Sequence, residues 1–270
     1  MLRIPLPEVK SAIMKVFDII IDVSKSGFED SELEHHLWDL LSFLYDTRQI
    51  ASNDYQFVRS GDSVRVAVAC PEPSALMMTP PTRYIAEKWP AIEALTQARI
   101  EIVEIGTDPN QAGYVIPQKP SFYILRQGWF SPLLCGDTGK PIPLYRIPPT
   151  NPDGDCYDNL RFWEKAYHRL YGLWIGSGVG ERFALGQMQD HQSALSQQGR
   201  ALCERIEALT GTPTYYHLFN YRGWSEKQDQ ARLCPVTGKL WRIEGSSTAD
   251  FIAFKSDEAR LVSELSFNCR

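Results

Sequence analysis

Two copies of one short turn sequence restrict the fold of this chain more than any other feature. Leu134–Lys140 reads Leu-Cys-Gly-Asp-Thr-Gly-Lys, and Leu233–Lys239 reads Leu-Cys-Pro-Val-Thr-Gly-Lys. A glycine at this place supplies the left-handed residue that a tight β-turn needs, and the threonine hydroxyl can bond to the turn backbone. We therefore expect two tight turns of the same shape. The similarity ends with the turn, so it does not indicate a duplicated domain.

The first half of the chain predicts a mixed α/β domain over residues 1–147. Strict alternation of apolar and polar residues is typical of a half-buried strand. This pattern predicts strands over Ser63–Cys70, Arg99–Ile105 and Ser121–Arg126.

Apolar residues at helical spacing predict the helices of the same half. One stripe of Ile13, Val16, Phe17, Ile20 and Ile21 predicts a first helix that starts near Pro7 and ends at Gly27. A second helix is expected from about Asp30, and a third over residues 81–97.

A turn-rich segment separates this half from the rest. Pro148–Asn159 combines proline, glycine and turn-forming acids, which is typical of a linker. The segment 148–212 then continues with a helical pattern, and 213–270 alternates like short strands. The expected fold class is α+β, in which an N-terminal α/β domain with a small sheet is followed by a helical segment and by ribbon-like β hairpins.

Motifs for catalysis are weak. Gly176, Gly178 and Gly180 lack the preceding strand and the spacing of a dinucleotide-binding loop, so they indicate a connection between helices. His168, His191 and His217 have no sequence neighbours whose arrangement predicts a triad, although triad partners are often distant in sequence. We expect a protein without catalytic residues, and an enzyme of unrecognised type remains an alternative.

Composition narrows the partners and the compartment. The formal net charge is −5 at a pI near 5.6, which argues against a strongly basic nucleic-acid binder. The N-terminus lacks the pattern of a signal peptide, and no run of apolar residues is long enough to span a bilayer. The six cysteines are scattered, as is usual for reduced thiols. We expect a cytoplasmic protein without membrane contact.

The spacing around the second turn matches that of a zinc ribbon. Cys234 and Thr237 form one pair, and Ser256 and Ala259 form a second pair eighteen residues further along. Zinc ribbons carry two Cys-x-x-Cys pairs about 15–20 residues apart. Only one of these four positions is cysteine, so spacing by itself does not establish a ribbon.

Several longer stretches carry a resemblance to a known family. They are SPLLCGDTGKPIPLYRIP from Ser131, FWEKAYHRLYGLWIGSGVGERFALGQM from Phe162, SALSQQGRALCERIEALTGTPTYYHLF from Ser193, CPVTGKLW from Cys234 and FKSDEARLVSELS from Phe254. From about Gly128 onward the chain resembles bacterial proteins of unknown function of the DUF2310 type. That family is described as zinc-ribbon-containing, with a suggested role in nucleic-acid binding.

The resemblance implies ligand positions that this chain has lost. Family members carry cysteine where Thr138, Thr237, Ser256 and Ala259 stand here, beside the retained Cys135 and Cys234. Structural zinc needs four thiolate or imidazole ligands, which threonine, serine and alanine cannot replace. We therefore expect six vestigial positions, no zinc and no other cofactor. An apolar core would hold the hairpins instead, with Trp241, Ile243, Phe251, Ile252 and Phe254 as candidates.

Bases and aromatics gather in the C-terminal part and are candidates for nucleic-acid binding. They are Tyr221, Arg222, Trp224, Lys227, Arg232, Lys239 and Arg242. Such a mixture suits stacking and phosphate contact on RNA or single-stranded nucleic acid. Two alternatives stay open: the aromatics are core and the bases a solvated face, or the acidic protein binds a protein partner as an inhibitor or immunity protein does.

Overall fold

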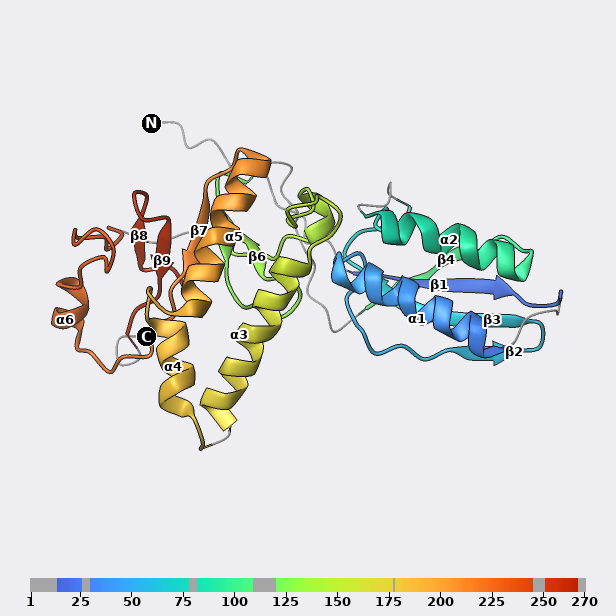
Figure 1. Cartoon of the computed structure of the whole chain (residues 1–270), viewed down its shortest axis with the longest axis horizontal. Coiled ribbons are helices and arrows are strands. Elements are labelled where there is room, and N and C mark those ends of the chain that lie inside the picture. The colour runs from blue at the N-terminus through green and yellow to red at the C-terminus, as the bar shows by residue number, and fades with distance from the viewer. Residues whose placement is uncertain are drawn as a thin grey trace. The chain divides into compact units, whose positions relative to one another are not determined.

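The chain divides into two compact units. The computed structural model describes residues 14–25, 30–77, 82–108, 120–176, 178–244 and 251–266. Backbone contacts separate Met1–Ile116 from Pro117–Arg270 (Figure 1). Both units combine helices with a sheet, which confirms the α+β class. The domain expected over 1–147 extends past the first unit. Residues 123–125, which fall inside that expected domain, pair with residues 214–216 beyond the expected linker, and both segments belong to one sheet of the second unit.

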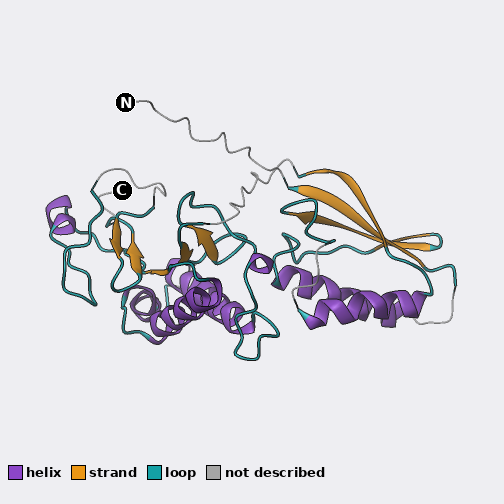
Figure 2. Cartoon of the chain, turned by 90° about the horizontal axis from the view of Figure 1, so that it is seen from above, coloured by secondary structure: helices purple, strands orange, loops and turns teal. Residues whose placement is uncertain are grey.

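The first unit is a β-α-β-β-α-β arrangement. Its elements are β1 (Lys15–Asp22), α1 (Asp30–Asp46), β2 (Val58–Ser60), β3 (Ser63–Cys70), α2 (Arg83–Thr96) and β4 (Glu101–Thr107). The strands pair in the order β2-β3-β1-β4, and every pair is antiparallel. This is the topology of the ferredoxin-like fold. Both helices pack on one face of the sheet (Figure 2).

The first helix expected from the sequence is wrong over the part that the structure describes. Residues 15–22 form the central strand β1, paired with β3 on one side and β4 on the other. Phe17, Ile19 and Ile21 are buried on alternate positions, as a strand requires. A short apolar run fits both periods, and its isoleucines favour the strand. The remainder of that expected helix, 7–13 and 26–27, lies outside the described residues.

The second unit holds a five-stranded mixed sheet. Its strands are β5 (Tyr123–Leu125), β6 (Leu133–Cys135), β7 (Thr214–His217), β8 (Phe254–Ser256) and β9 (Leu261–Ser263). The order is β6-β5-β7-β9-β8, in which β5, β7 and β9 run parallel. Its helices are α3 (Asp158–Gly176), α4 (Glu181–Gln189), α5 (Ala194–Thr210), α6 (Glu226–Gln230) and the short η1 (Leu144–Arg146). The three glycines considered as a phosphate loop connect α3 to α4.

Both faces of this second sheet are buried. On one face, Tyr216 and Leu261 pack with Trp163 and other residues of α3 and α5 in the main core. On the other face, Tyr215 and Val262 pack in a smaller cluster. The core expected to hold the hairpins is confirmed, since Trp241 and Phe254 belong to the first cluster, and Ile252, Ile243 and Phe251 to the second.

Gly199 allows α5 to lie directly against the sheet. A Cβ atom at Gly199 would come within 2.3 Å of the Tyr216 ring and within 2.8 Å of Trp163 Nε1. We expect Gly199→Ala to lower the unfolding free energy by about 1–3 kcal/mol, the usual cost of overpacking a core. Gly172→Ala on α3 is the matched control, because a Cβ there meets nothing within 4 Å.

Urea denaturation of the two variants measures this difference. Removing a helical glycine without a clash stabilises by up to about 1 kcal/mol, so Gly172→Ala should match or exceed the wild type. Equal stability of the two variants would contradict the close packing of α5 on Tyr216.

Candidate functional site

The two repeated turn sequences adopt the same backbone structure. In the first, Gly139 N–H donates to the carbonyl of Cys135 at 2.7 Å, and Cys135 N–H donates to the carbonyl of Lys140 at 2.8 Å. In the second, Gly238 donates to Cys234 and Cys234 donates to Lys239, both at 2.9 Å. Gly139 and Gly238 have φ of 67° and 66°. The expected left-handed glycines are therefore confirmed.

The threonine of each turn bonds to the turn backbone, as expected. Lys140 N–H donates to Thr138 Oγ1, and Lys239 N–H donates to Thr237 Oγ1, each at 3.3 Å. A further turn of related shape joins β8 to β9. There Ala259 N–H donates to Ser256 Oγ at 3.2 Å, and Arg260 has a left-handed φ of 50° at the place of the glycine.

The second and third turns face each other through Cys234. Burial alone would raise the pKa of the Cys234 thiol, but hydrogen bonds from Thr237, from the Val236 backbone and from the Ser256 hydroxyl lower the pKa below its ordinary value. Cys234 and Ala259 are buried in the main core. The four positions that match zinc ligands thus meet in one place.

The residues at this meeting point do not fit a zinc ion. Cys234 offers one thiolate, Thr237 and Ser256 offer hydroxyls, and Ala259 offers no ligand atom. A structural zinc site takes four ligands from thiolates, imidazoles and carboxylates. Hydrogen bonds and packing hold these turns together.

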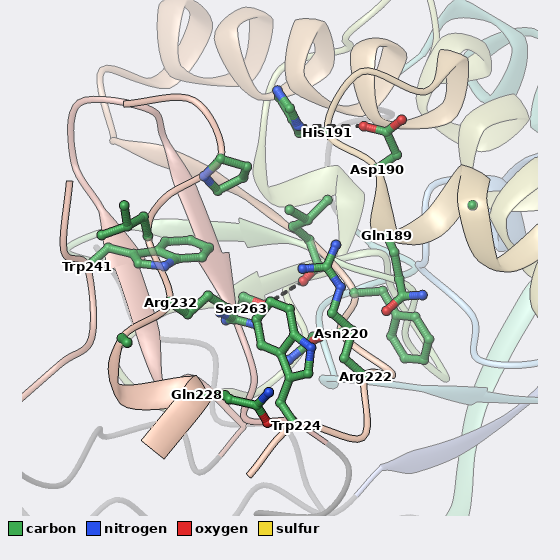
Figure 3. A pocket seen from close by; sticks show the side chains of 16 residues that line it. Gln189, Asp190, His191, Asn220, Arg222, Trp224, Gln228, Arg232, Trp241 and Ser263 are labelled. Carbon is green, nitrogen blue, oxygen red and sulfur yellow. Dashed lines mark hydrogen bonds and ion pairs between the residues drawn. The ribbon is translucent and has the colours of Figure 1, made fainter. Parts of the chain in front are cut away.

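A cavity of about 760 Å³ lies beside the second turn (Figure 3). Leu218 and Phe219 follow the carboxyl end of β7, and Ser263 is the last residue of β9. The cavity therefore opens beyond the carboxyl ends of two parallel strands, which is where ligands bind in open α/β sheets. Other lining residues come from α4, from α6 and from the second turn.

Aromatic and basic side chains meet at this cavity. The guanidinium of Arg222 lies 4.6 Å from the centre of the Trp224 ring. Trp241 lines the cavity from the segment after the second turn, and His191 and Asp190 contribute from the loop after α4 (Figure 3). His191 Nδ1 lies 3.5 Å from an Asp190 carboxylate oxygen. The lining combines flat apolar surfaces with hydrogen-bond donors.

Arg232 is the buried cation of the cavity. Its guanidinium lies 3.7 Å from the Phe254 ring centre and 5.1 Å from that of Trp241. Burial lowers the pKa of Arg232 to about 10, although the nearby carboxylates of Asp229 and Glu264 act in the opposite direction. The guanidinium therefore stays charged at neutral pH.

A cluster of buried polar groups contacts Arg232. Arg232 Nη2 donates to the Glu264 carbonyl at 3.2 Å, and the Glu264 carboxylate forms an ion pair with His217. Asn220 N–H donates to the same carboxylate at 2.8 Å. Asp229 accepts from the backbone and hydroxyl of Ser266 at 2.6 and 2.7 Å. These bonds hold the chain that follows β7 against the chain that follows β9.

The structure brings together part of the predicted binding set. Arg222, Trp224 and Arg232 line the cavity. Tyr221 instead packs on Trp174, with ring centres 4.6 Å apart.

The other basic residues predicted to bind nucleic acid do not line the cavity. Lys227 is exposed on α6, and Lys239 pairs with Glu258 at 2.5 Å. Arg242 belongs to an isolated bridge with Phe254.

Sequence reasoning missed other lining residues. Gln189, His191, Asn220 and Gln228 reach the cavity from separate segments. Which of those side chains meet depends on how α4 and α6 pack.

Comparison with known proteins places two matches on the second unit. Residues 117–219 match the domain of unknown function DUF2310, and residues 223–269 match the domain of unknown function DUF8594. The cavity is lined from both matched regions, with Phe219 in the first and Arg222 adjoining the second.

Two relatives come from Haemophilus influenzae, each described as an uncharacterized protein. One is 38% identical over 138 residues, which are 51% of this chain and 52% of the relative. The other is 37% identical over 138 residues, which are 51% of this chain and 66% of the relative. The chain thus spans between half and two thirds of these relatives. No solved structure matches the chain significantly.

Proposed function

We propose that the second unit is a non-catalytic binding module for single-stranded nucleic acid, with its site at the cavity beyond β7 and β9. The observation that carries this proposal is the convergence of Arg222, Trp224 and Arg232 on one cavity. An indole face offers a stacking platform for any base, and a guanidinium offers a phosphate contact. The formal charge of −5 limits such binding to a local site instead of the whole surface.

We further propose that the hairpins after residue 213 form a zinc-ribbon-like pair that does not hold zinc. Support comes from the three related turns and from the meeting of Cys234 with Thr237 and Ser256. The described cysteines are free and buried, which fits reduced thiols in the cytoplasm. In the described part of the chain, every helix is too short or too polar to cross a membrane.

Binding to a labelled single-stranded oligonucleotide, followed by fluorescence anisotropy at low and high salt, tests the proposed activity. Trp224→Ala should weaken binding about 5- to 150-fold, because loss of one stacking partner costs about 1–3 kcal/mol. Arg222→Gln should also weaken binding and flatten its salt dependence, since phosphate contacts release counterions.

Arg169→Gln is the matched control for charge. Arg169 is exposed on α3 and does not line the cavity. It should bind as the wild type does. Absence of binding even at low salt, or equal loss in the control, would refute the proposal and favour a protein partner. The exposed Leu233, Val236 and Leu240 around the second turn are the surface on which to look for that partner.

A further inference from the structure

The size of the cavity limits what it can hold. Its volume of about 760 Å³ lies inside the range of about 300–1,000 Å³ that is usual for small-ligand pockets. Proteins that bind long single strands instead use a groove that follows the backbone over several nucleotides. The lining of this cavity combines cations with aromatic rings.

Several cations of the C-terminal hairpins do not line the cavity and are paired with carboxylates. Three basic side chains of the C-terminal hairpins form ion pairs at distances of 2.5–2.9 Å. They are Lys239 with Glu258, Lys255 with Asp257, and Arg260 with Glu207. A phosphate would have to displace a carboxylate at each of them. The positive charge that is directed at a ligand is therefore concentrated in Arg222 and Arg232.

The cavity lining offers the contacts that one base with its phosphate needs. Trp224 supplies a ring surface, and the guanidinium of Arg222 lies over one part of it, 4.6 Å from the ring centre. Trp241 also lines the cavity, but it is 5% exposed and belongs to the core.

We infer that the cavity accepts a single nucleotide unit, one base with its phosphate, and does not follow a strand over several nucleotides. This inference rests on the proposed function and narrows it. The nucleobase and its phosphate would be recognised together, the nucleobase by the indole of Trp224 and the phosphate by the guanidinium of Arg222. A free nucleotide and a terminal or unstacked nucleotide of a strand share this chemistry.

A length series tests the inference on the full chain. 5′-Phosphorylated thymidylates of one, two, four, eight and twelve nucleotides are titrated at several salt concentrations. We expect affinity to level off by the dinucleotide. The salt slope should then stay near that of one or two phosphates, at about −0.7 per phosphate for single strands. Equal affinity for the mononucleotide and the dinucleotide assigns the site to free nucleotides, and tighter dinucleotide binding assigns it to a strand.

Two other outcomes separate failure of the inference from failure of the proposed function. Affinity and salt slope that keep rising to the twelve-nucleotide strand overturn the single-unit site but leave nucleic-acid binding in place. No binding at any length removes both.

Discussion

Replacing Glu264 by leucine is expected to lower the unfolding free energy by about 3–5 kcal/mol, the usual cost of leaving one member of a buried ion pair alone. Glu264 is 6% exposed and its carboxylate pairs with His217, which is 1% exposed. It also accepts the Asn220 N–H at 2.8 Å. The substitution therefore leaves a buried imidazole and a buried backbone donor without their acceptor.

A double substitution separates the ion pair from packing. His217→Leu combined with Glu264→Leu replaces the buried pair by apolar groups, which is often nearly neutral. The double variant should therefore recover most of the stability lost in Glu264→Leu. If the single leucine variant fails to fold, Glu264→Gln keeps the shape and reports the lost charge. Urea denaturation of all three measures the result, and equal stability of single and double variants would contradict the pairing.

The same residue predicts an acid dependence of stability. Burial opposes the charged form of Glu264, but the nearby His217 and the Asn220 N–H outweigh it and hold the pKa below its ordinary value. A carboxylate with a lowered folded pKa contributes stability that is complete above the unfolded pKa of about 4.3 and is lost as the pH falls through the folded pKa. The wild type should therefore lose more stability than Glu264→Leu between about pH 4.3 and the lower folded pKa.

Local periodicity predicted the elements of the chain where one interpretation dominated. The alternation of Ser63–Cys70 became β3 with the expected bounds, and the helix expected from about Asp30 became α1. The segment around Ile19 and Ile20 failed because its apolar run fits a helix and a strand equally well. Its strand partners are β3 and β4, far along the chain, and pairing with them decided the outcome.

The residues of the candidate site also divide into those that the sequence identified and those that it did not. Arg222 and Trp224 were identified from the sequence because bases and aromatics alternate within one short segment. His191 and Asn220 were not, because their approach to the cavity depends on the parallel pairing of β7 with β9 and on the end of α4. Composition could therefore identify the segment that carries the binding groups, but only the topology of the sheet defined the cavity.

The turns around Cys234 lead to the second large effect. Cys234, Thr237, Ser256 and Ala259 lie on two turns that contact each other through the Cys234 thiol. Thiolates at all four positions would supply the complete ligand set of a structural zinc site, with zinc–sulfur distances of about 2.3 Å. We therefore expect the variant Thr237→Cys, Ser256→Cys, Ala259→Cys to bind one zinc ion per chain and the wild type to bind none.

The expected gain is large because metal binding is coupled to folding. Apparent zinc affinities of small structural sites correspond to about 10–16 kcal/mol at neutral pH. A ligand that binds the folded state and not the unfolded state raises the stability of the protein by mass action. Elemental analysis of the purified variant, cobalt substitution with its thiolate absorption bands, and melting temperature with and without a chelator measure the effect. The chelator should lower the melting temperature of the triple variant and leave that of the wild type unchanged.

Thr138→Cys is the matched control for the zinc variant. It places a second thiol on the first turn, whose backbone has the same hydrogen bonds and a glycine φ of 67° at Gly139. The described part of the wild-type structure holds no group of three or more potential metal ligands. In the variant, two thiols and the carboxylate of Asp137 beside Cys135 fall short of the four ligands of a structural site, so they should not retain zinc through purification. If Thr138→Cys held as much zinc as the triple variant, zinc retention would reflect nonspecific binding to added thiols and not a site formed by the facing turns. If the triple variant held none, the two facing turns would not have the geometry of a ribbon. Zinc in the triple variant alone would establish that this chain kept the backbone of a metal site while hydrogen bonds to Cys234 and the surrounding core took over its structural role.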